Sequence, residues 1–276
     1  MPLLETLQHI LDGAGWRVNV QTFLLIFGLL FARLVAILSL VPFLGGPSVS
    51  SRIKVGLSAV IAATLLPHFS LAGTPLALSP LTYVVLLAKE IVVGSMIGFI
   101  AQLVFYAIRM AGIIIDTQRG MNQITYLAPE LSGNTSILGS LKFQAALVIF
   151  LSLGGHLTFL RIVADTFSRI PLLALPRMQA GLAALADQAA HITGDALRAG
   201  LALSAPIVAA IFLVDVGFAC LGKVAPQIRI SGDSNTVKSW VGLALFFLAA
   251  ALLLDRLPGF FAAMLQSLEE FSKAMS

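Results

Sequence analysis

The stretch SWVGLALFFLAAALLL, residues 239–254, contains no charged side chain and decides the fold class. A helix that crosses the hydrocarbon core of a bilayer needs about 20 mostly apolar residues, and this stretch with its flanks meets that need. Its apolar residues follow one another directly, whereas the strands of a membrane β-barrel alternate apolar with polar positions. We therefore expect an all-α, polytopic membrane protein.

Further stretches without Asp, Glu, Lys or Arg extend this pattern over the whole chain: 18–32, 34–51, 55–88, 91–108, 143–160 and 199–214. Prolines and glycines divide them into expected helices over 20–41, 50–66, 81–115, 137–160, 199–222 and 239–262. We also expect an amphipathic segment over 177–198 and a short interfacial segment over 1–17. Because no repeat or low-complexity linker separates them, residues 1–276 are predicted to form a single membrane domain with about six hydrophobic helical segments.

Composition agrees with a membrane location. Of the 276 residues, 58% are hydrophobic and 11% are charged, while soluble domains average about 25% charged residues. The net charge of +4 comes from scattered basic residues that form no stripe, which argues against a nucleic-acid partner. A single cysteine, Cys220, excludes an intramolecular disulfide framework and a cysteine-based metal cluster.

Several ionisable residues lie within or at the ends of the apolar stretches: Arg33, Lys89, Glu90, Arg109, Asp215 and Asp255. Each costs at least about 2.5–3.5 kcal/mol at the centre of a membrane helix. They indicate either an ion path or ion pairing and packing between helices and subunits. Lys89 and Glu90 are adjacent and point about 100° apart on a helix. We therefore expect them to pair with other helices rather than with each other.

Two weaker signals concern packing. Gly94 and Gly98 have the small-xxx-small spacing that lets two helices approach closely. His156 follows Gly154 and Gly155 inside an apolar stretch. Because no second ligand stands at a metal-binding spacing beside it, we interpret it as a hydrogen-bonded packing residue.

The polar stretch DTQRGMNQITYLAPELSGNTS, residues 116–136, interrupts the apolar helices. Irregular backbone at membrane depth occurs only where protein or a water-filled cavity satisfies it. Two interpretations stay open here: an ordinary surface loop, or a re-entrant element that constricts a path through the membrane.

Enzymatic signatures are missing from the sequence. It contains no H-E-x-x-H, no G-x-S-x-G, no Walker loop and no G-x-G-x-x-G after a strand. We therefore expect no catalytic residue, no metal site and no cofactor. A small-solute secondary transporter stays open as an alternative, because such proteins also have Pro- and Gly-interrupted helices with buried charges.

A set of short motifs in a fixed order resembles the FliR/SctT family of type III secretion export proteins over nearly the whole chain. The motifs comprise Ala32-Arg33, Pro42, Arg52, Lys89-Glu90, Gly94, Gly98, Gly112, Asp116-x-Gln118-Arg119-Gly120, Pro129, Gly133, Ser136, Gly139, Gly154-Gly155, Ala205-Pro206, Ala225-Pro226-Gln227 and Lys238. The form of the Asp116 motif is more similar to the injectisome branch, SctT. Ile228-Arg229-Ile230 departs from the family pattern after Gln227.

The resemblance implies a non-enzymatic subunit of the export gate in the bacterial inner membrane. It implies long, broken helices that form hairpins, and a loop that helps to plug the closed channel. The implied partners are SctR/FliP-like and SctS/FliQ-like membrane subunits, an SctU/FlhB-like switch protein, the export-gate ring and the unfolded secreted proteins.

By position, the implied plug residues are Asp116, Gln118, Arg119, Gly120, Asn122, Pro129 and Gly133. Residues expected to serve intersubunit packing or ion pairing are Arg33, Lys89, Glu90, Gly94, Gly98, Asp215, Pro226, Gln227 and Lys238. Unpaired charges and an overlong helix suit contact with other subunits better than contact with lipid.

Overall fold

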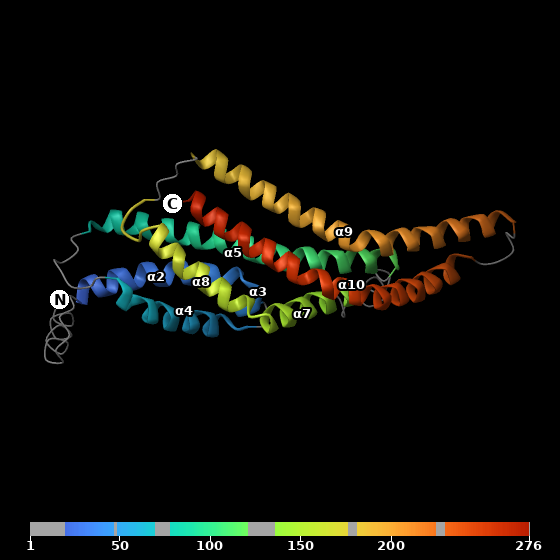
Figure 1. The fold of residues 1–276 in the computed structure, drawn as a ribbon, viewed down its shortest axis with the longest axis horizontal. Coiled ribbons are helices and arrows are strands. Elements are labelled where there is room, and N and C mark those ends of the chain that lie inside the picture. The colour runs from blue at the N-terminus through green and yellow to red at the C-terminus, as the bar shows by residue number, and fades with distance from the viewer. Residues whose placement is uncertain are drawn as a thin grey trace. The chain divides into compact units, whose positions relative to one another are not determined.

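The computed structural model describes residues 20–46, 49–69, 78–120, 136–175, 181–224 and 230–275, and these residues form helices and no strand (Figure 1). The helices are α2 (Val20–Leu40), α3 (Pro42–Gly45), α4 (Ser51–Leu65), the 3₁₀ turn η1 (Leu66–His68), α5 (Pro80–Gln118), α7 (Ile137–Ser152), α8 (Gly155–Arg169), α9 (Gly181–Val224) and α10 (Ile230–Ala274). The all-α prediction is confirmed. The expected segment over 1–17 lies outside the described residues.

Local chemistry explains where the first helices end. Val41 is extended and Pro42 occupies the first turn of α3, because proline disfavours a helical residue before it and suits the first helical turn. After α5, Gly120 adopts a φ of 75°, the left-handed conformation in which helices commonly end and which glycine accepts without strain. The expected helix over 81–115 is thus correct but too short at both ends.

Two expected helix boundaries are wrong. The segments 177–198 and 199–222 join into the continuous helix α9, and Pro206 lies inside it, because its alanine-rich sequence favours helix and apolar helices tolerate proline. The expected helix over 137–160 instead breaks between α7 and α8, where Gly154 has a φ of 72° and the two helices are bent by 73°.

Three described helices are long and apolar enough to cross a membrane, namely Val20–Leu40, Pro80–Gln118 and Ala183–Val224. The bent pair α7 and α8 would make a fourth if it forms one broken span. Helix α4 has 15 residues, and a shorter apolar stretch of α10 covers Asn235–Leu248 within the described residues. That the chain has about six hydrophobic helical segments stays a prediction.

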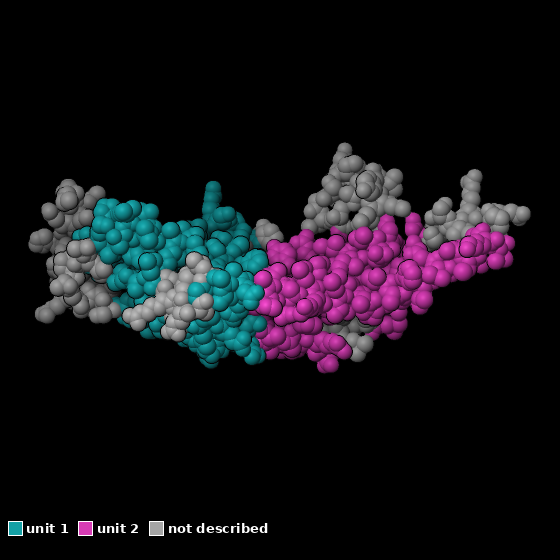
Figure 2. Space-filling model, turned by 90° about the horizontal axis from the view of Figure 1, so that it is seen from above, with its two compact units in different colours: residues 1–102, 157–188, 266–276 teal, residues 103–156, 189–265 magenta. Residues whose placement is uncertain are grey.

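The chain divides into two compact units, which Figure 2 distinguishes by colour. Unit 1 contains residues Met1–Gln102, Leu157–Gln188 and Gln266–Ser276, and unit 2 contains Leu103–His156 and Ala189–Leu265. Helices α5, α9 and α10 contribute residues to both units. That residues 1–276 act as a single domain stays a prediction.

In unit 1, α2 and α5 are packed closely at the two glycines that the sequence singles out. A Cβ on Gly94 would lie 2.5 Å from the Arg33 carbonyl oxygen, and one on Gly98 would lie 3.0 Å from the Ile37 carbonyl oxygen. The close approach expected from the spacing is made within the chain. A contact of these glycines with another subunit stays a prediction.

Unit 2 has a core of its own. Ile115, Leu138, Ile207, Ile211 and Phe246 form one buried cluster from four helices. A second group is aromatic: the Phe105 ring centroid lies 5.3 Å from that of Phe150 and 5.5 Å from that of Phe261. These clusters position the ends of α5 and α7, where the polar residues discussed below gather.

Replacing Gly94 by alanine is expected to lower the melting temperature of the purified protein. The new methyl group would meet the Arg33 carbonyl oxygen at 2.5 Å and the Ala36 Cβ at 2.9 Å, and overpacking of this kind costs about 1–3 kcal/mol. Gly217→Ala in α9 is the matched control, because a Cβ there meets nothing within 4 Å. The control should be neutral or stabilising by up to about 1 kcal/mol. Equal melting temperatures for both variants would contradict the close packing of α2 on α5.

Candidate functional site: two buried charge networks

The first network lies in unit 1 and joins α2, α5 and the end of α8. The Arg33 side chain is fully buried, and its Nε donates to Glu90 Oε2. Its Nη1 donates to the Thr166 carbonyl oxygen at 3.1 Å and its Nη2 to the Ile170 carbonyl oxygen at 3.0 Å. The guanidinium also lies over the Phe167 ring, 4.3 Å from its centroid, a favourable cation–π geometry.

Lys89 completes this network by binding the chain just after α8. Its Nζ donates to the carbonyl oxygens of Pro171 at 2.7 Å, Leu172 at 3.0 Å and Ala174 at 3.0 Å. Arg33 therefore binds carbonyl oxygens at the end of α8, Lys89 binds those of the chain that follows, and both cations flank Glu90.

The expectation that Lys89 and Glu90 do not pair with each other is wrong. Lys89 Nζ lies 2.6 Å from Glu90 Oε1, although this carboxylate oxygen has no hydrogen bond in acceptable geometry. The long lysine side chain bends across the angle that separates the two Cβ atoms. An intersubunit role for Arg33, Lys89 and Glu90 stays a prediction, since their described partners belong to this chain.

The end of α10 is fastened to the end of α8 by a more exposed group of charges. Arg169 Nη1 donates to Ser272 Oγ at 3.0 Å, and Arg169 Nη2 lies 3.6 Å from Glu269 Oε1. Lys273 Nζ lies 2.8 Å from the same oxygen. The hydrogen bond from Lys273 holds the pKa of the Glu269 carboxyl below its usual value, so this ion pair persists until the solution is acidic.

The second network lies in unit 2, at the two ends of the polar stretch. Asp116 is buried in the last turn of α5. Its Oδ2 accepts hydrogen bonds from Ser136 Oγ at 2.9 Å and from the Leu138 backbone N–H at 2.8 Å. Ser136 in turn caps α7, because its Oγ accepts from the Gly139 N–H at 2.9 Å. A carboxylate is favoured at this position because the N-terminus of a helix offers unpaired N–H donors and positive potential.

Arg119 links the same carboxylate to α10. Its Nη1 donates to Asp116 Oδ1 at 3.1 Å and its Nε donates to the Ser239 carbonyl oxygen at 3.2 Å. The arginine stem lies against Gly242, where a Cβ would come within 2.7 Å of Arg119 Cδ. Asp116 and Arg119 therefore fix the end of α5, the start of α7 and the side of α10 at one point.

A buried lysine that the sequence does not single out lies in the same unit. Lys142 of α7 is 6% exposed, and within the described residues its Nζ has no hydrogen-bond partner. The ammonium group lies 5.6 Å from the centroid of the Phe246 ring. The sequence gives no signal for its burial, because Lys142 directly precedes the charge-free stretch 143–160.

Asp215 of α9 and Lys238 of α10 form an ion pair within unit 2. Of the remaining residues expected in the plug, Gln118 is exposed at the end of α5 and Gly120 ends that helix. Five expected site residues lie outside the described residues, namely Asn122, Pro129, Gly133, Pro226 and Gln227.

A metal centre has no set of ligands in the described part of the chain. Among the described residues, no group of three or more His, Cys, Asp or Glu side chains could hold a metal ion. In the described part of the chain, the buried Nδ1 of His156 has no hydrogen-bond partner, so the hydrogen bond expected of this residue is not made by that atom. The charges instead hold helix ends together.

Long apolar helices, buried charge networks and a polar segment held at both ends define a multi-spanning helical membrane protein. The family model described as bacterial export proteins, family 1, matches residues 24–264. The chain belongs to this family.

Relatives from two kinds of bacterial system match most of the chain. The flagellar biosynthetic protein FliR of Pectobacterium carotovorum subsp. carotovorum is 30% identical over 83% of this chain and 84% of that protein. The Yop proteins translocation protein T of Yersinia pestis is 28% identical over 80% of this chain and 84% of that protein. The surface presentation of antigens protein SpaR of Shigella flexneri is 25% identical over 87% of this chain and 91% of that protein. These identities are so similar that membership of the injectisome branch stays a prediction.

Proposed function

We propose that the chain is a non-enzymatic subunit of the type III secretion export gate in the bacterial inner membrane. Its role there is to form and close the entry to the channel for unfolded proteins. The match to the bacterial export family over residues 24–264 carries this proposal. Relatives named for flagellar biosynthesis and for Yop translocation support it. Apolar helices without a metal-binding cluster in the described residues are compatible with a structural role.

The specific partners follow from the same family. We infer that SctR/FliP-like and SctS/FliQ-like subunits cover the apolar surfaces that this chain leaves open, for example Phe212, Leu213 and Trp240, which are 63%, 70% and 69% exposed. An SctU/FlhB-like switch protein and the export-gate ring would lie alongside. Transport would draw its energy from partner proteins rather than from chemistry in this chain.

The Asp116 network supports a plug built from residues 116–136. Asp116 binds Ser136 and Leu138 directly, so the segment between them starts and ends at one fixed point. A segment held in this way can change its packing while both helix ends stay in place. Opening would then be a shift between two packings, biased by the substrate and by partner subunits.

Deleting residues 124–128 is expected to make assembled export gates leak ions while the complexes still form. The deletion shortens the proposed plug but leaves Asp116, Arg119 and Ser136 in place. Complexes purified at matched amounts would be reconstituted into vesicles and tested for ion flux. A deletion of equal length, 71–75, between α4 and α5 is the control. Unchanged ion flux in the 124–128 variant would reject the plug.

Normal protein secretion by cells that lack the whole gene would reject the export-gate function itself.

A further inference from the structure

A buried lysine amine without a hydrogen-bond partner lies beside the Asp116 network in unit 2. Lys142 is 6% exposed, and in the described part of the chain its Nζ makes no hydrogen bond. Burial of such a group reduces the stability of a fold, and the cation–π contact with Phe246 at 5.6 Å offsets only part of this loss. A methionine would fill the same space without the loss. The buried amine therefore calls for a role other than stabilising this arrangement.

The direction of the lysine side chain brings its amine toward Asp116. Lys142 follows Leu138 by four residues, so both side chains leave the same face of α7, and long side chains on a helix point back toward its N-terminus. The Leu138 backbone N–H donates to Asp116 Oδ2 at 2.8 Å. The Asp116 carboxylate therefore lies at the end of α7 toward which Lys142 points, and its negative charge acts on the lysine amine.

The other helices around this part of α7 offer the lysine amine no free carboxylate among the described residues. The side chains of α9 and α10 that pack here belong to the apolar cluster of unit 2. Asp215 of α9 is already paired with Lys238. Asp116 is therefore the carboxylate with which Lys142 can pair.

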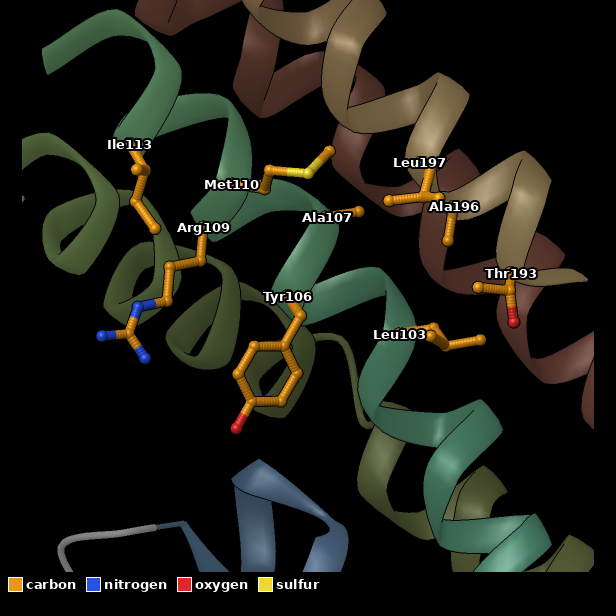
Figure 3. A pocket seen from close by; sticks show the side chains of 9 residues that line it. All are labelled: Leu103, Tyr106, Ala107, Arg109, Met110, Ile113, Thr193, Ala196 and Leu197. Carbon is orange, nitrogen blue, oxygen red and sulfur yellow. The ribbon is translucent and has the colours of Figure 1, made fainter. Parts of the chain in front are cut away.

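A second basic residue, Arg119, already binds the same carboxylate. Its Nη1 donates to Asp116 Oδ1 at 3.1 Å. Arg109 of α5 has a different neighbour, since its Cζ lies 5.8 Å from the centroid of the Phe143 ring. Figure 3 shows the Arg109 side chain at the edge of an apolar pocket, extending away from the α9 residues. Two basic residues, Arg119 and Lys142, are thus placed to compete for one carboxylate.

These two basic residues differ in what holds them. Arg119 follows the last residue of α5, in the turn that reaches Gly120, and its Nε donates to the Ser239 carbonyl oxygen of α10 at 3.2 Å. Asp116 and Lys142 instead lie within α5 and α7, whose ends are joined by a hydrogen bond. A rearrangement of the turn would remove Arg119 from the carboxylate and leave Asp116 and Lys142 in place.

We propose that Lys142 is a second cationic partner of Asp116, which takes the place of Arg119 when the turn after α5 rearranges. The carboxylate then keeps a counter-charge, and the end of α5 stays bound to the start of α7. The two arrangements differ in which cation binds Asp116, so any binding event that holds Arg119 elsewhere shifts the protein from one to the other. The proposal concerns contacts within this chain and is independent of the export function.

A double-mutant cycle on the purified full-length protein tests this exchange, with the melting temperature as the measured quantity. Arg119→Gln removes the present cation from Asp116, and we expect it to lower the melting temperature by about 2–4 °C while Lys142 is available. In a Lys142→Met background the same change should lower it by about twice as much or more, because the buried carboxylate then has no cation. Lys142→Met alone should leave the melting temperature unchanged or raise it, since it removes the unpaired amine.

Lys223→Met is the matched control, because Lys223 is an exposed lysine of α9 in the same unit. Arg119→Gln should have the same effect with and without this control change. Equal effects of Arg119→Gln in the wild-type and Lys142→Met backgrounds would overturn the proposal, and so would failure of Arg119→Gln alone to fold, since Lys142 would then not replace Arg119. A large fall in melting temperature for Lys142→Met alone would overturn it as well. Loss of folded protein only in the Arg119→Gln and Lys142→Met double variant would support it.

Discussion

Glu90→Gln is expected to reduce the free energy of unfolding by about 3–5 kcal/mol, the usual effect of removing one partner from a buried ion pair. The Glu90 and Arg33 side chains are both fully buried, and Glu90 is the only carboxylate among their described contacts. Glutamine has the same size, so the loss comes from the uncompensated charges of Arg33 and Lys89. Because whole domains have only about 5–15 kcal/mol of stability, little folded protein should be recovered. The yield and melting temperature of the detergent-purified protein measure this effect.

Asp195→Asn supplies the control for the same carboxyl-to-amide change. Asp195 pairs with Arg198 at 3.1 Å, but these side chains are 71% and 83% exposed, and exposed pairs contribute only about 0–1 kcal/mol. Adding Arg33→Met to Glu90→Gln should recover part of the lost stability, because the double variant no longer buries the unpaired guanidinium. A Glu90→Gln protein as stable as wild type would mean that the carbonyl oxygens after α8 suffice for both cations.

The sequence identifies the members of this network but not its geometry. Arg33, Lys89 and Glu90 stand out because charges are rare in apolar helices. Most of their other partners are backbone carbonyl oxygens between Thr166 and Ala174. A carbonyl group is present at every residue, so no side-chain pattern marks these partners. The pairing of Lys89 with Glu90 was missed because the angle between adjacent Cβ atoms does not limit where a flexible lysine ends.

A helix boundary can be predicted where a residue such as proline restricts the backbone. It cannot be predicted where only the side-chain composition changes along the chain. The end of α2 before Pro42 follows from the restrictions that proline imposes. The break at Gly154 has a visible signal in the Gly154-Gly155 pair, but glycines also occur inside apolar helices, as Gly217 does in α9. The join within α9 near Arg198 was missed because a change from amphipathic to apolar sequence does not interrupt the backbone hydrogen bonds.

For the Asp116 network too, the sequence identifies the residues and only the structure gives their contacts. Asp116 and Arg119 stand out as two of the three charged residues of the polar stretch, the third being Glu130. Their contacts with the start of α7 and with Ser239 of α10 depend on how three helices pack, which the sequence alone does not determine. Lys142 shows the limit most clearly, because a lysine at the edge of an apolar stretch looks the same whether it reaches solvent or, as here, a buried aromatic ring.

Asp116→Ala is expected to cost about 3–5 kcal/mol, because it leaves the buried Arg119 without its counter-charge. Three hydrogen bonds disappear with the carboxylate, those from Arg119, Ser136 Oγ and the Leu138 N–H. The start of α7 then loses its contact with the end of α5, and the segment between them is no longer held at a fixed point. We expect the few complexes that assemble to leak ions and to secrete little protein. Ion flux per reconstituted complex and secretion per cell are the measurements.

We call the contacts of Asp116 with Ser136 and Leu138 the anchor. Ser136→Ala and Asp255→Asn distinguish loss of this anchor from a general loss of stability. Ser136→Ala removes one hydrogen bond to Asp116 and the side-chain cap of α7, which costs about 0.5–2 kcal/mol, so ion flux should lie between those of wild type and Asp116→Ala. Asp255 is an exposed carboxylate on α10, and its change to asparagine should alter neither flux nor secretion. A graded rise in flux from Ser136→Ala to Asp116→Ala would tie closure of the gate to this anchor. If Asp116→Ala complexes hold ions as tightly as wild type, the anchor only stabilises the fold, and the plug must be held by contacts with other subunits.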